Sequence, residues 1–161
     1  TYDDIFSDFD PRPFAERAMS QDFLEEAKRA VRDKPSGDIL LSFLMPKKLR
    51  NVSQENIIRK RLFEHFVNHN FSLKAEKRKI VIRGIIFALA GLILMFITTA
   101  ILYETILKGY LITFLIVLLE PAGWFLFWDG LELAIFEAQK MNKDLDFYKK
   151  MENCEIRFVS F

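Results

Sequence analysis

Two long apolar runs dominate the pattern of hydrophobic and polar positions along the chain. The first, from Gly84 to Tyr103, contains 20 consecutive uncharged residues, and the second, from Gly109 to Trp128, contains 20 residues with one charge, Glu120. Twenty residues of α-helix extend about 30 Å, the thickness of the hydrocarbon core of a bilayer. The short segment "ETILK" separates the two runs. The pattern therefore predicts two membrane-spanning helices that form a hairpin.

Helical patterns also flank the first apolar run. Apolar residues between positions 13 and 33 lie close to one face of a helix. A further helix is expected from Asn51, because Asn51 and Gln54 have the spacing of a capping box. Nothing interrupts this helix before the first span, so we expect it to continue into that span. Its predicted buried stripe consists of Ile58, Leu62, Phe66 and Val67.

Two short segments have the properties of strands. "DILLSFLM" (38–45) is apolar on both faces and bounded by glycine and proline, and "CEIRFVSF" (154–161) has a similar character. A two-stranded sheet is marginal in water by itself. We therefore expect helices to cover these strands, or the strands to pair across subunits.

The predicted fold class is mainly α, a two-helix transmembrane hairpin with a small cytoplasmic α+β domain. The N-terminal arm is acidic and aromatic, and its prolines discourage regular structure. It is either a loose arm or a partner-docking peptide built on Tyr2, Phe6 and Phe9. The expected order is the acidic arm (1–12), a helix–strand–helix region (13–79), the hairpin (80–128), and a helix and strand (129–161) that pack on the N-terminal region.

The lysine and arginine residues near the spans predict an orientation. Basic residues gather before the first span, whereas the hairpin tip contains only Lys108. The positive-inside rule therefore places both termini in the cytoplasm, in a multi-pass protein with two spans. The basic residues expected at the inner leaflet, where they attract anionic lipid, are Lys74, Lys77, Arg78 and Lys79.

Aromatic residues agree with this orientation. Tyr103 and Tyr110 flank the hairpin tip, and Trp124 and Trp128 lie at the inner end of the second span. Tyrosine and tryptophan are enriched at the two interfaces of a membrane. These four residues are therefore predicted to form the interfacial belts.

Arg83, at the inner end of the first span, is expected to pair with an acid on the second span. With a turn centred near Leu107, Arg83 lies level with Leu131, between Asp129 and Glu132. Charges at membrane depth usually pair with one another. We therefore predict that an ion pair with Asp129 or Glu132 fixes the register of the hairpin.

Glu120 and Pro121 interrupt the second apolar run. A charged carboxylate in hydrocarbon is costly, and proline removes a helical amide donor. Three interpretations remain open: Glu120 caps a helix that breaks at Pro121, it lines a subunit interface, or its copies line a wet cation pathway. Its nearest polar candidates are Thr98, Thr99 and Thr113.

Small residues recur at helical spacing along the first span, at Gly84, Ala88 and Gly91. Such residues let another helix approach closely. The stripe fits contact with the second span of the same chain, and it also fits homo-oligomerisation.

The sequence contains no convincing catalytic or metal-binding constellation. His65 and His69 have the i, i+4 spacing of a zinc pair, but no third ligand is evident and Cys154 is the single cysteine. The spacing of Arg59 and His65 in "RKRLFEH" resembles that of HEPN ribonucleases, which basic helices reproduce readily. We therefore expect no enzyme, no metal and no cofactor, with a membrane-tethered HEPN-like nuclease as the alternative.

Three segments together resemble a family of small, uncharacterised prokaryotic membrane proteins with two spans. They are "DILLSFLMP" before the spans, "GWFLFWDGLE" at the end of the second span and "EIRFVSF" after it. The resemblance covers about residues 10–161. It implies the same domain order and no activity.

These observations predict a non-catalytic, homo-oligomeric membrane anchor, an assembly or accessory subunit. A net charge of +1 argues against a general nucleic-acid binder. The expected partners are the lipid bilayer, further copies of the chain, and a possible second membrane or cytoplasmic protein. The alternative is an oligomeric pore lined by Glu120.

Overall fold

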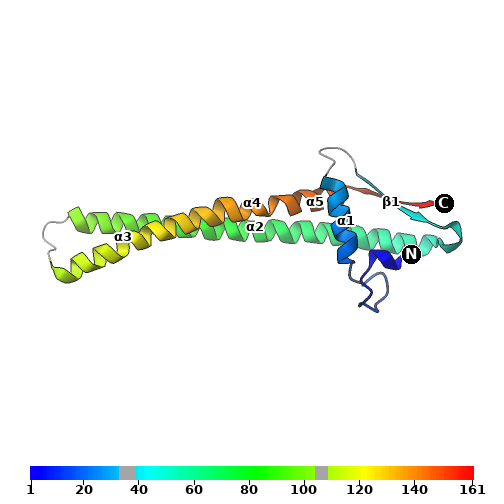
Figure 1. Cartoon of the computed structure of the whole chain (residues 1–161), viewed down its shortest axis with the longest axis horizontal. Helices are drawn as coiled ribbons and strands as arrows, with labels where there is room; N and C mark the ends of the chain where they lie inside the picture. The colour runs from blue at the N-terminus through cyan, green and yellow to red at the C-terminus, as the bar shows by residue number, and fades with distance from the viewer. Residues whose placement is uncertain (33–38, 104–108) are drawn as a thin grey trace. The chain divides into compact units, whose positions relative to one another are not determined.

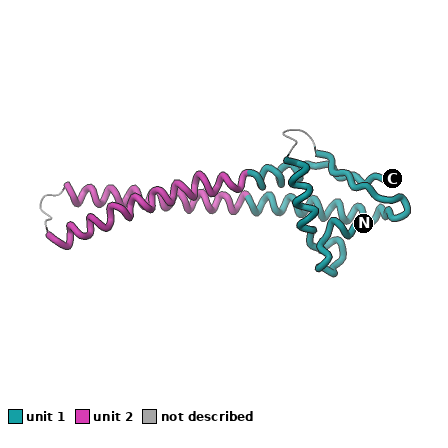
Figure 2. Tube along the Cα trace, in the orientation of Figure 1, with its two compact units in different colours: residues 1–73, 143–161 teal, residues 74–142 magenta. Residues whose placement is uncertain are grey.

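The computed structural model describes residues 1–32, 39–103 and 109–161. The chain forms two compact units (Figure 2): unit 1 consists of residues 1–73 and 143–161, and unit 2 consists of residues 74–142. The protein is mainly helical, with two long apolar helices and a small sheet (Figure 1). The coarse fold class predicted from the sequence is therefore confirmed.

The elements follow one another in an order close to the predicted one. The longest is α2, which contains 52 residues without interruption. In chain order the elements are η1 (Asp3–Ile5), α1 (Gln21–Arg32), β1 (Leu40–Met45), η2 (Lys47–Leu49), α2 (Val52–Tyr103), α3 (Tyr110–Leu131), the π-helical segment η3 (Glu132–Glu137), α4 (Ala138–Lys140), α5 (Asn142–Glu152) and β2 (Glu155–Ser160).

Asn51 starts helix α2, as its spacing from Gln54 predicted. Its side-chain Oδ1 accepts hydrogen bonds from the backbone N–H groups of Ser53 (3.0 Å) and Gln54 (3.3 Å). These bonds satisfy two amides that have no partner within the first turn of a helix. The helix then continues through the first apolar run, so the predicted continuous helix is confirmed.

The two predicted strands form one parallel sheet. The register pairs Leu40 with Glu155 and continues to Met45 with Ser160. A parallel pair requires a long crossover connection, and here the connection includes α2, α3 and α5. One face of the sheet is apolar and half-buried or buried, with Phe43 stacked on Phe158 at 5.2 Å between ring centroids.

Helix α2 supplies the centre of the unit 1 core. Ile58, Leu62 and Phe66 follow one another at intervals of four residues, and all three are 0% exposed. Val67, the fourth member of the predicted stripe, is half-buried. The buried cluster consists of Tyr2, Ile5, Phe6, Met19, Ala27, Val31, Met45, Ile58, Leu62, Phe66, Phe147, Tyr148, Met151, Ile156 and Phe158.

The N-terminal segment is part of this core, which corrects the prediction of a loose arm. Tyr2 and Phe6 are buried, and Phe6 forms an antiparallel bridge with Met19. Phe9 is 96% exposed. Helix α1 begins only at Gln21 rather than near position 13, because the segment before it holds two prolines and folds back on η1 instead.

Helices α2 and α3 pack through backbone contacts in unit 2. A Cβ atom added to Gly84 would lie 2.6 Å from the carbonyl oxygen of Gly130, and one added to Gly91 would lie 2.6 Å from that of Gly123. Real side chains do not approach this closely, so only glycine fits. The small-residue stripe therefore serves contact within the chain. The predicted turn at Leu107 and Lys108 lies outside the described residues.

Helix α3 continues through Pro121 from Tyr110 to Leu131. The predicted helix break at Pro121, with Glu120 as the cap of a new segment, is therefore not present. Neighbouring helical bonds hold the backbone in place, although Pro121 itself donates none. The irregular part of this helix lies further on, in the π-helical residues Glu132–Glu137, which the sequence did not reveal.

Candidate functional site

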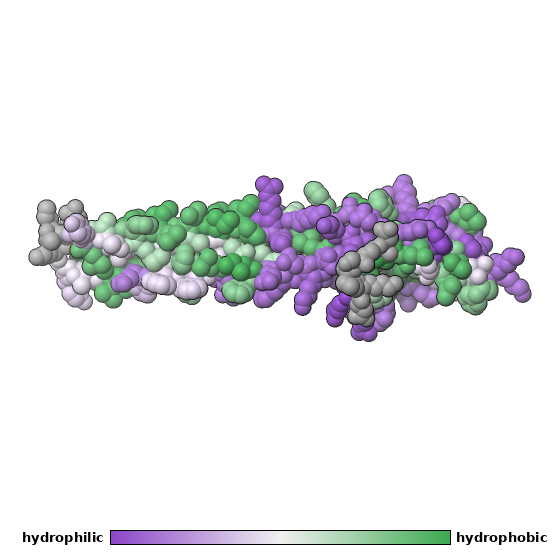
Figure 3. Space-filling view, turned by 90° about the horizontal axis from the view of Figure 1, so that it is seen from above, coloured by the Kyte–Doolittle hydropathy of each residue, from purple (hydrophilic) through white to green (hydrophobic). Residues whose placement is uncertain are grey.

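The outward surface of the hairpin is apolar. In an apolar stretch of 18 residues within α2, only 11% of the stretch is buried. In the matching stretch of the continuous helix Tyr110–Glu152, only 6% is buried. Figure 3 shows this surface as a mostly green region. Both helices are long and apolar enough to cross a membrane. The exposed large side chains include Ile85, Ile86, Leu89, Ile93, Phe96, Ile97, Leu111, Phe114, Leu115, Val117, Leu118 and Phe125.

Glu120 lies on this outward surface. Its side chain is exposed, and it makes no hydrogen bond or ion pair with the residues that the structure describes. At 100° per residue, Thr113 and Trp124 share its side of α3. The ring of Trp124 stacks on that of Trp128, with centroids 6.3 Å apart. This face of α3, containing Val117, Glu120, Trp124 and Trp128, is called the Glu120 face below.

The three threonines predicted near Glu120 do not contact it. Thr98 is buried between the helices and donates to the Leu94 carbonyl at 2.9 Å. Thr99 and Thr113 are exposed, and each donates to a carbonyl of its own helix, at 2.9 Å and 3.2 Å. Each hydroxyl is therefore satisfied locally, as is common for threonine in helices.

Pro121 creates a second polar irregularity on the same face. Proline has no N–H, so it cannot bond to the carbonyl of Val117 four residues earlier. The Val117 side chain is 65% exposed. The Glu120 carboxyl and the Val117 carbonyl, which lacks the Pro121 donor, are therefore within one helical turn of each other.

Arg83 and its two predicted partners lie at one end of the apolar surface. Gly84 packs between Gly130 and Ala134, which agrees with a hairpin centred near position 107. Arg83 is exposed, and within the described residues no ion pair joins it to Asp129 or Glu132. The structure thus brings the helices into the expected register without forming the predicted pair.

The remaining predicted membrane residues lie at the two ends of the apolar surface. Tyr103 and Tyr110 are exposed near the hairpin tip, and the two tryptophans are exposed toward the other end. Beyond them, Lys77 donates to Asn142 at 2.6 Å. The exposed basic side chains of this region are those of Lys74, Arg78 and Lys79.

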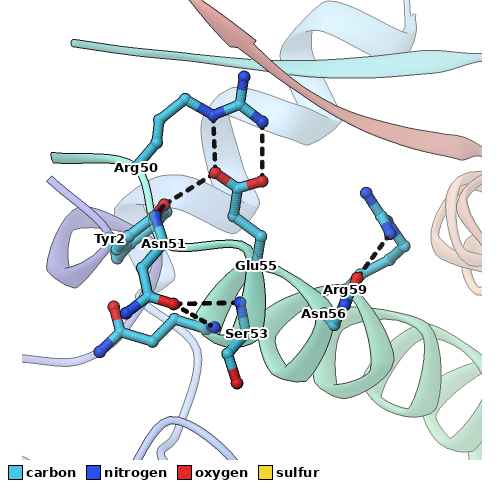
Figure 4. Close-up of polar contacts among 8 residues, drawn as sticks. Tyr2, Arg50, Asn51, Ser53, Glu55, Asn56 and Arg59 are labelled. Atoms are coloured by element: carbon cyan, nitrogen blue, oxygen red, sulfur yellow. Dashed lines mark hydrogen bonds and ion pairs between the residues drawn. The ribbon is translucent and has the colours of Figure 1, made fainter. Parts of the chain in front are cut away.

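Unit 1 contains a buried polar network around Glu55 (Figure 4). Arg50 donates two hydrogen bonds of 2.8 Å to the Glu55 carboxylate, and the Tyr2 hydroxyl donates a third at 2.9 Å. The backbone N–H of Asn51 donates to the Tyr2 hydroxyl at 3.0 Å. Arg50 lowers the pKa of Glu55 against the opposing effect of burial, and burial raises the pKa of Tyr2. The network attaches the N-terminal segment to the start of α2.

Sequence reasoning missed this network. The available signal was Glu55, which lies on the buried stripe of α2 three residues before Ile58, with Arg50 close before it. A buried carboxylate needs a cationic or hydrogen-bonding partner. The partner Tyr2 is 53 residues away in sequence and could not be inferred from local spacing.

His65 and His69 lie side by side on α2 against Tyr148 of α5. Their ring centroids are 4.1 Å apart, and the His69 ring stacks on Tyr148 at 5.3 Å. The Nε2 atom of His65 is buried and has no hydrogen-bond partner in the described part of the chain. Burial, together with nearby His69 and Arg61, lowers the pKa of His65 to about 4. Among the residues described, no group of three metal-binding side chains is present.

Arg59 and His65 contact different elements. Arg59 donates to the Ile156 carbonyl of β2 at 3.2 Å and to the Asn56 side chain at 3.1 Å. His65 packs against Tyr148 of α5 instead. The spacing that resembles HEPN ribonucleases therefore does not bring the two side chains together. Cys154 is half-buried, and burial raises the pKa of its thiol.

One surface cleft of about 310 Å³ in unit 1 is rich in charge. Lys28 pairs with Asp144 at 3.0 Å, and Lys150 pairs with Asp146 at 2.8 Å. Phe147 forms part of its wall. Arg32 and Lys143 also line the cleft, so its basic side chains outnumber its acidic ones.

Comparison with family models, curated proteins and solved structures found no match for this chain. The resemblance to small prokaryotic proteins with two spans therefore stays a prediction, and functional inference must start from the geometry of the hairpin.

Proposed function

We propose that this chain is an integral membrane protein whose hairpin crosses the bilayer twice, with both termini in the cytoplasm. The observation that supports this most is the apolar outward surface of α2 and α3, which remains almost entirely uncovered by the chain itself. Water would disfavour such a surface, whereas hydrocarbon accepts it. The basic residues beyond one end support the orientation, and the exposed tyrosines near the other end support an interface there.

Within the membrane, the protein acts without catalysis, as a homo-oligomeric anchor or assembly subunit. Unit 1 holds its own folded core and would be kept at the membrane by the hairpin. The partnerless Glu120 supports assembly, because a polar group in hydrocarbon requires a partner. Assembly with further copies would give Glu120 a hydrogen-bond partner that its own chain does not provide.

The test uses the full chain in its native membrane. Resistance to alkaline carbonate extraction is expected for a spanning protein, and release into the supernatant would contradict the proposal. Native mass after mild detergent extraction should then correspond to several copies of the chain. A monomer would exclude the homo-oligomeric anchor, and a fixed ratio with another protein would make the chain an accessory subunit.

The exposure of Glu120 also favours a second candidate, a cation pathway between copies. In such an assembly, carboxylates from several copies would line a wet pore. Purified protein in liposomes would then conduct cations, and Glu120→Gln would reduce the flux. Vesicles without any leak would exclude this candidate.

A further inference from the structure

The Glu120 face combines a carboxyl group that has no partner among the described residues with the Val117 carbonyl, which lacks the N–H that a residue other than proline would donate at position 121. In hydrocarbon the neutral carboxylic acid is the less costly form of glutamate, and it carries an O–H donor. The Val117 carbonyl is an acceptor that lacks its helical donor because of Pro121. Lipid tails can bond neither group, and unsatisfied polar groups in hydrocarbon cost several kcal/mol.

We propose that the Glu120 face packs against the same face of a second copy of this chain. In this pairing, the Glu120 carboxyl of each copy donates a hydrogen bond to the Val117 carbonyl of the other. The inference rests on the proposed membrane insertion and names the surface through which the copies assemble. These two reciprocal hydrogen bonds give a partner to both Glu120 carboxyl groups and to both Val117 carbonyl groups.

Membrane geometry favours a second copy as the occupant. Copies inserted with one orientation hold each residue at the same depth, and a two-fold axis along the membrane normal brings identical faces together. Glu120 and Val117 lie three residues apart, about 4.5 Å along the helix axis. The flexible glutamate side chain covers this step, so one face can serve as donor and acceptor at once.

The other outward faces of the hairpin do not offer such complementarity. On α3, Leu118 and Phe125 are exposed on a different side from Glu120 and carry only hydrocarbon. Between residues 85 and 103 of α2 the exposed side chains are aliphatic or phenyl groups, apart from the self-bonded Thr99 and the terminal Tyr103. The stacked indoles of Trp124 and Trp128 extend the Glu120 face with large, rigid surfaces.

Cysteine cross-linking in membranes locates the interface. In the full chain carrying Cys154→Ala, Val117→Cys and Trp124→Cys should form disulfide-linked dimers under mild oxidation. The matched controls are Leu118→Cys and Phe125→Cys, each one residue from a test position and so rotated about 100° around α3. Dimers that form equally well or better through the control positions would overturn the proposal.

Three substitutions test the assigned hydrogen bonds. For each variant, the dissociation constant of the dimer is measured in detergent or in bilayers. Glu120→Gln keeps a donor and should change the constant by less than about threefold, whereas Glu120→Leu should weaken the dimer roughly tenfold or more. Pro121→Ala restores the helical donor to the Val117 carbonyl and should weaken the dimer similarly, although it regularises the helix. A dimer unaffected by Pro121→Ala or Glu120→Leu would overturn the bonding scheme.

The outcomes separate this inference from the proposed function. If the wild-type protein is monomeric, or absent from the membrane, both the proposed function and the pairing through the Glu120 face are contradicted. An intact oligomer that cross-links through Leu118→Cys and Phe125→Cys would overturn the Glu120 face alone. Cation flux that Glu120→Gln abolishes would also overturn it, because that result requires a charged carboxylate rather than a hydrogen-bond donor.

Discussion

Glu55 and Glu120 show how differently the two units treat a carboxyl group among apolar residues. Glu55, in unit 1, is 3% exposed and receives hydrogen bonds from Arg50 and Tyr2. Glu120, in unit 2, is exposed on an apolar surface and has no partner in the described chain. Unit 1 thus provides hydrogen-bond partners for Glu55, whereas the described part of unit 2 provides none for Glu120.

Apolar side chains show the same contrast. In unit 1 they meet in a buried core centred on Phe66, as in a protein that folds in water. In unit 2 the helices meet through Gly84, Gly91 and Gly130, and the large side chains point outward. The difference indicates that substitutions inside unit 1 act on its own stability; under the proposed function, those on the outside of unit 2 should act on assembly.

The largest expected effect follows from breaking the Glu55 network. Arg50→Met removes the cation and both of its hydrogen bonds from the Glu55 carboxylate, leaves only the Tyr2 donor, and should lower the stability of unit 1 clearly. The change is measured by thermal unfolding of unit 1, with protease sensitivity as the readout of unfolding. Arg29→Met is the matched control, because its pair with Glu26 is exposed on both sides and should contribute less than about 0.5 kcal/mol. Equal effects of the two variants would contradict the contrast between buried and exposed pairs.

A somewhat smaller effect is expected from Gly91→Leu in unit 2. The new side chain would meet the backbone of α3 at Gly123 and Phe127, so the helices must separate, at a cost of about 2–3 kcal/mol. Ala90→Leu is the control, since Ala90 is exposed next to it. Stability in detergent, measured by thermal unfolding, should fall for the glycine variant and not for the alanine variant.

The pH dependence of unit 1 should reflect His65. Its pKa is lowered from 6.5 to about 4, so the unfolded chain binds the proton more readily between these values. Stability is therefore fully present above pH 6.5 and decreases as the pH falls toward 4. The decrease should be on the order of 1 kcal/mol, because solvent reaches part of the side chain. His65→Gln should flatten this part of the pH profile of unit 1, and an unchanged profile would contradict the assignment.

The smallest expected effect concerns Glu120 in the isolated chain. Because Glu120 has no partner there, Glu120→Leu should change the stability of monomeric protein in dilute detergent by less than about 0.5 kcal/mol. The same variant should weaken assembly. A large loss of monomer stability would show that Glu120 has a role within its own hairpin.

Much of the fold could be predicted because its signals are local. The strands β1 (Leu40–Met45) and β2 (Glu155–Ser160) lie within the two predicted segments, and the continuous pattern after Asn51 became α2. Counting residues from a turn near position 107 also gave the register that places Gly84 against Gly130 and Ala134. Helical and strand periodicity determine such features without knowledge of tertiary contacts.

The features that sequence reasoning missed depend on distant contacts. The acidic N-terminal segment resembles a disordered arm by composition, yet Tyr2 finds Glu55 in the tertiary structure. The predicted break at Pro121 did not occur, since one missing hydrogen bond leaves the rest of the helix intact. The outward direction of Glu120 followed only once the glycines had fixed which side of α3 faces α2.

The parallel pairing of β1 with β2 determines when unit 1 can be completed during synthesis. Residues Glu155–Ser160 are synthesised long after β1, and β1 cannot gain its neighbouring strand before they leave the ribosome. Closing a loop of this length is slow for a free chain. A hairpin already inserted in the membrane would hold α5 close to α2 and thereby shorten the search. If the hairpin inserts as proposed, insertion would therefore accelerate the pairing of β1 with β2.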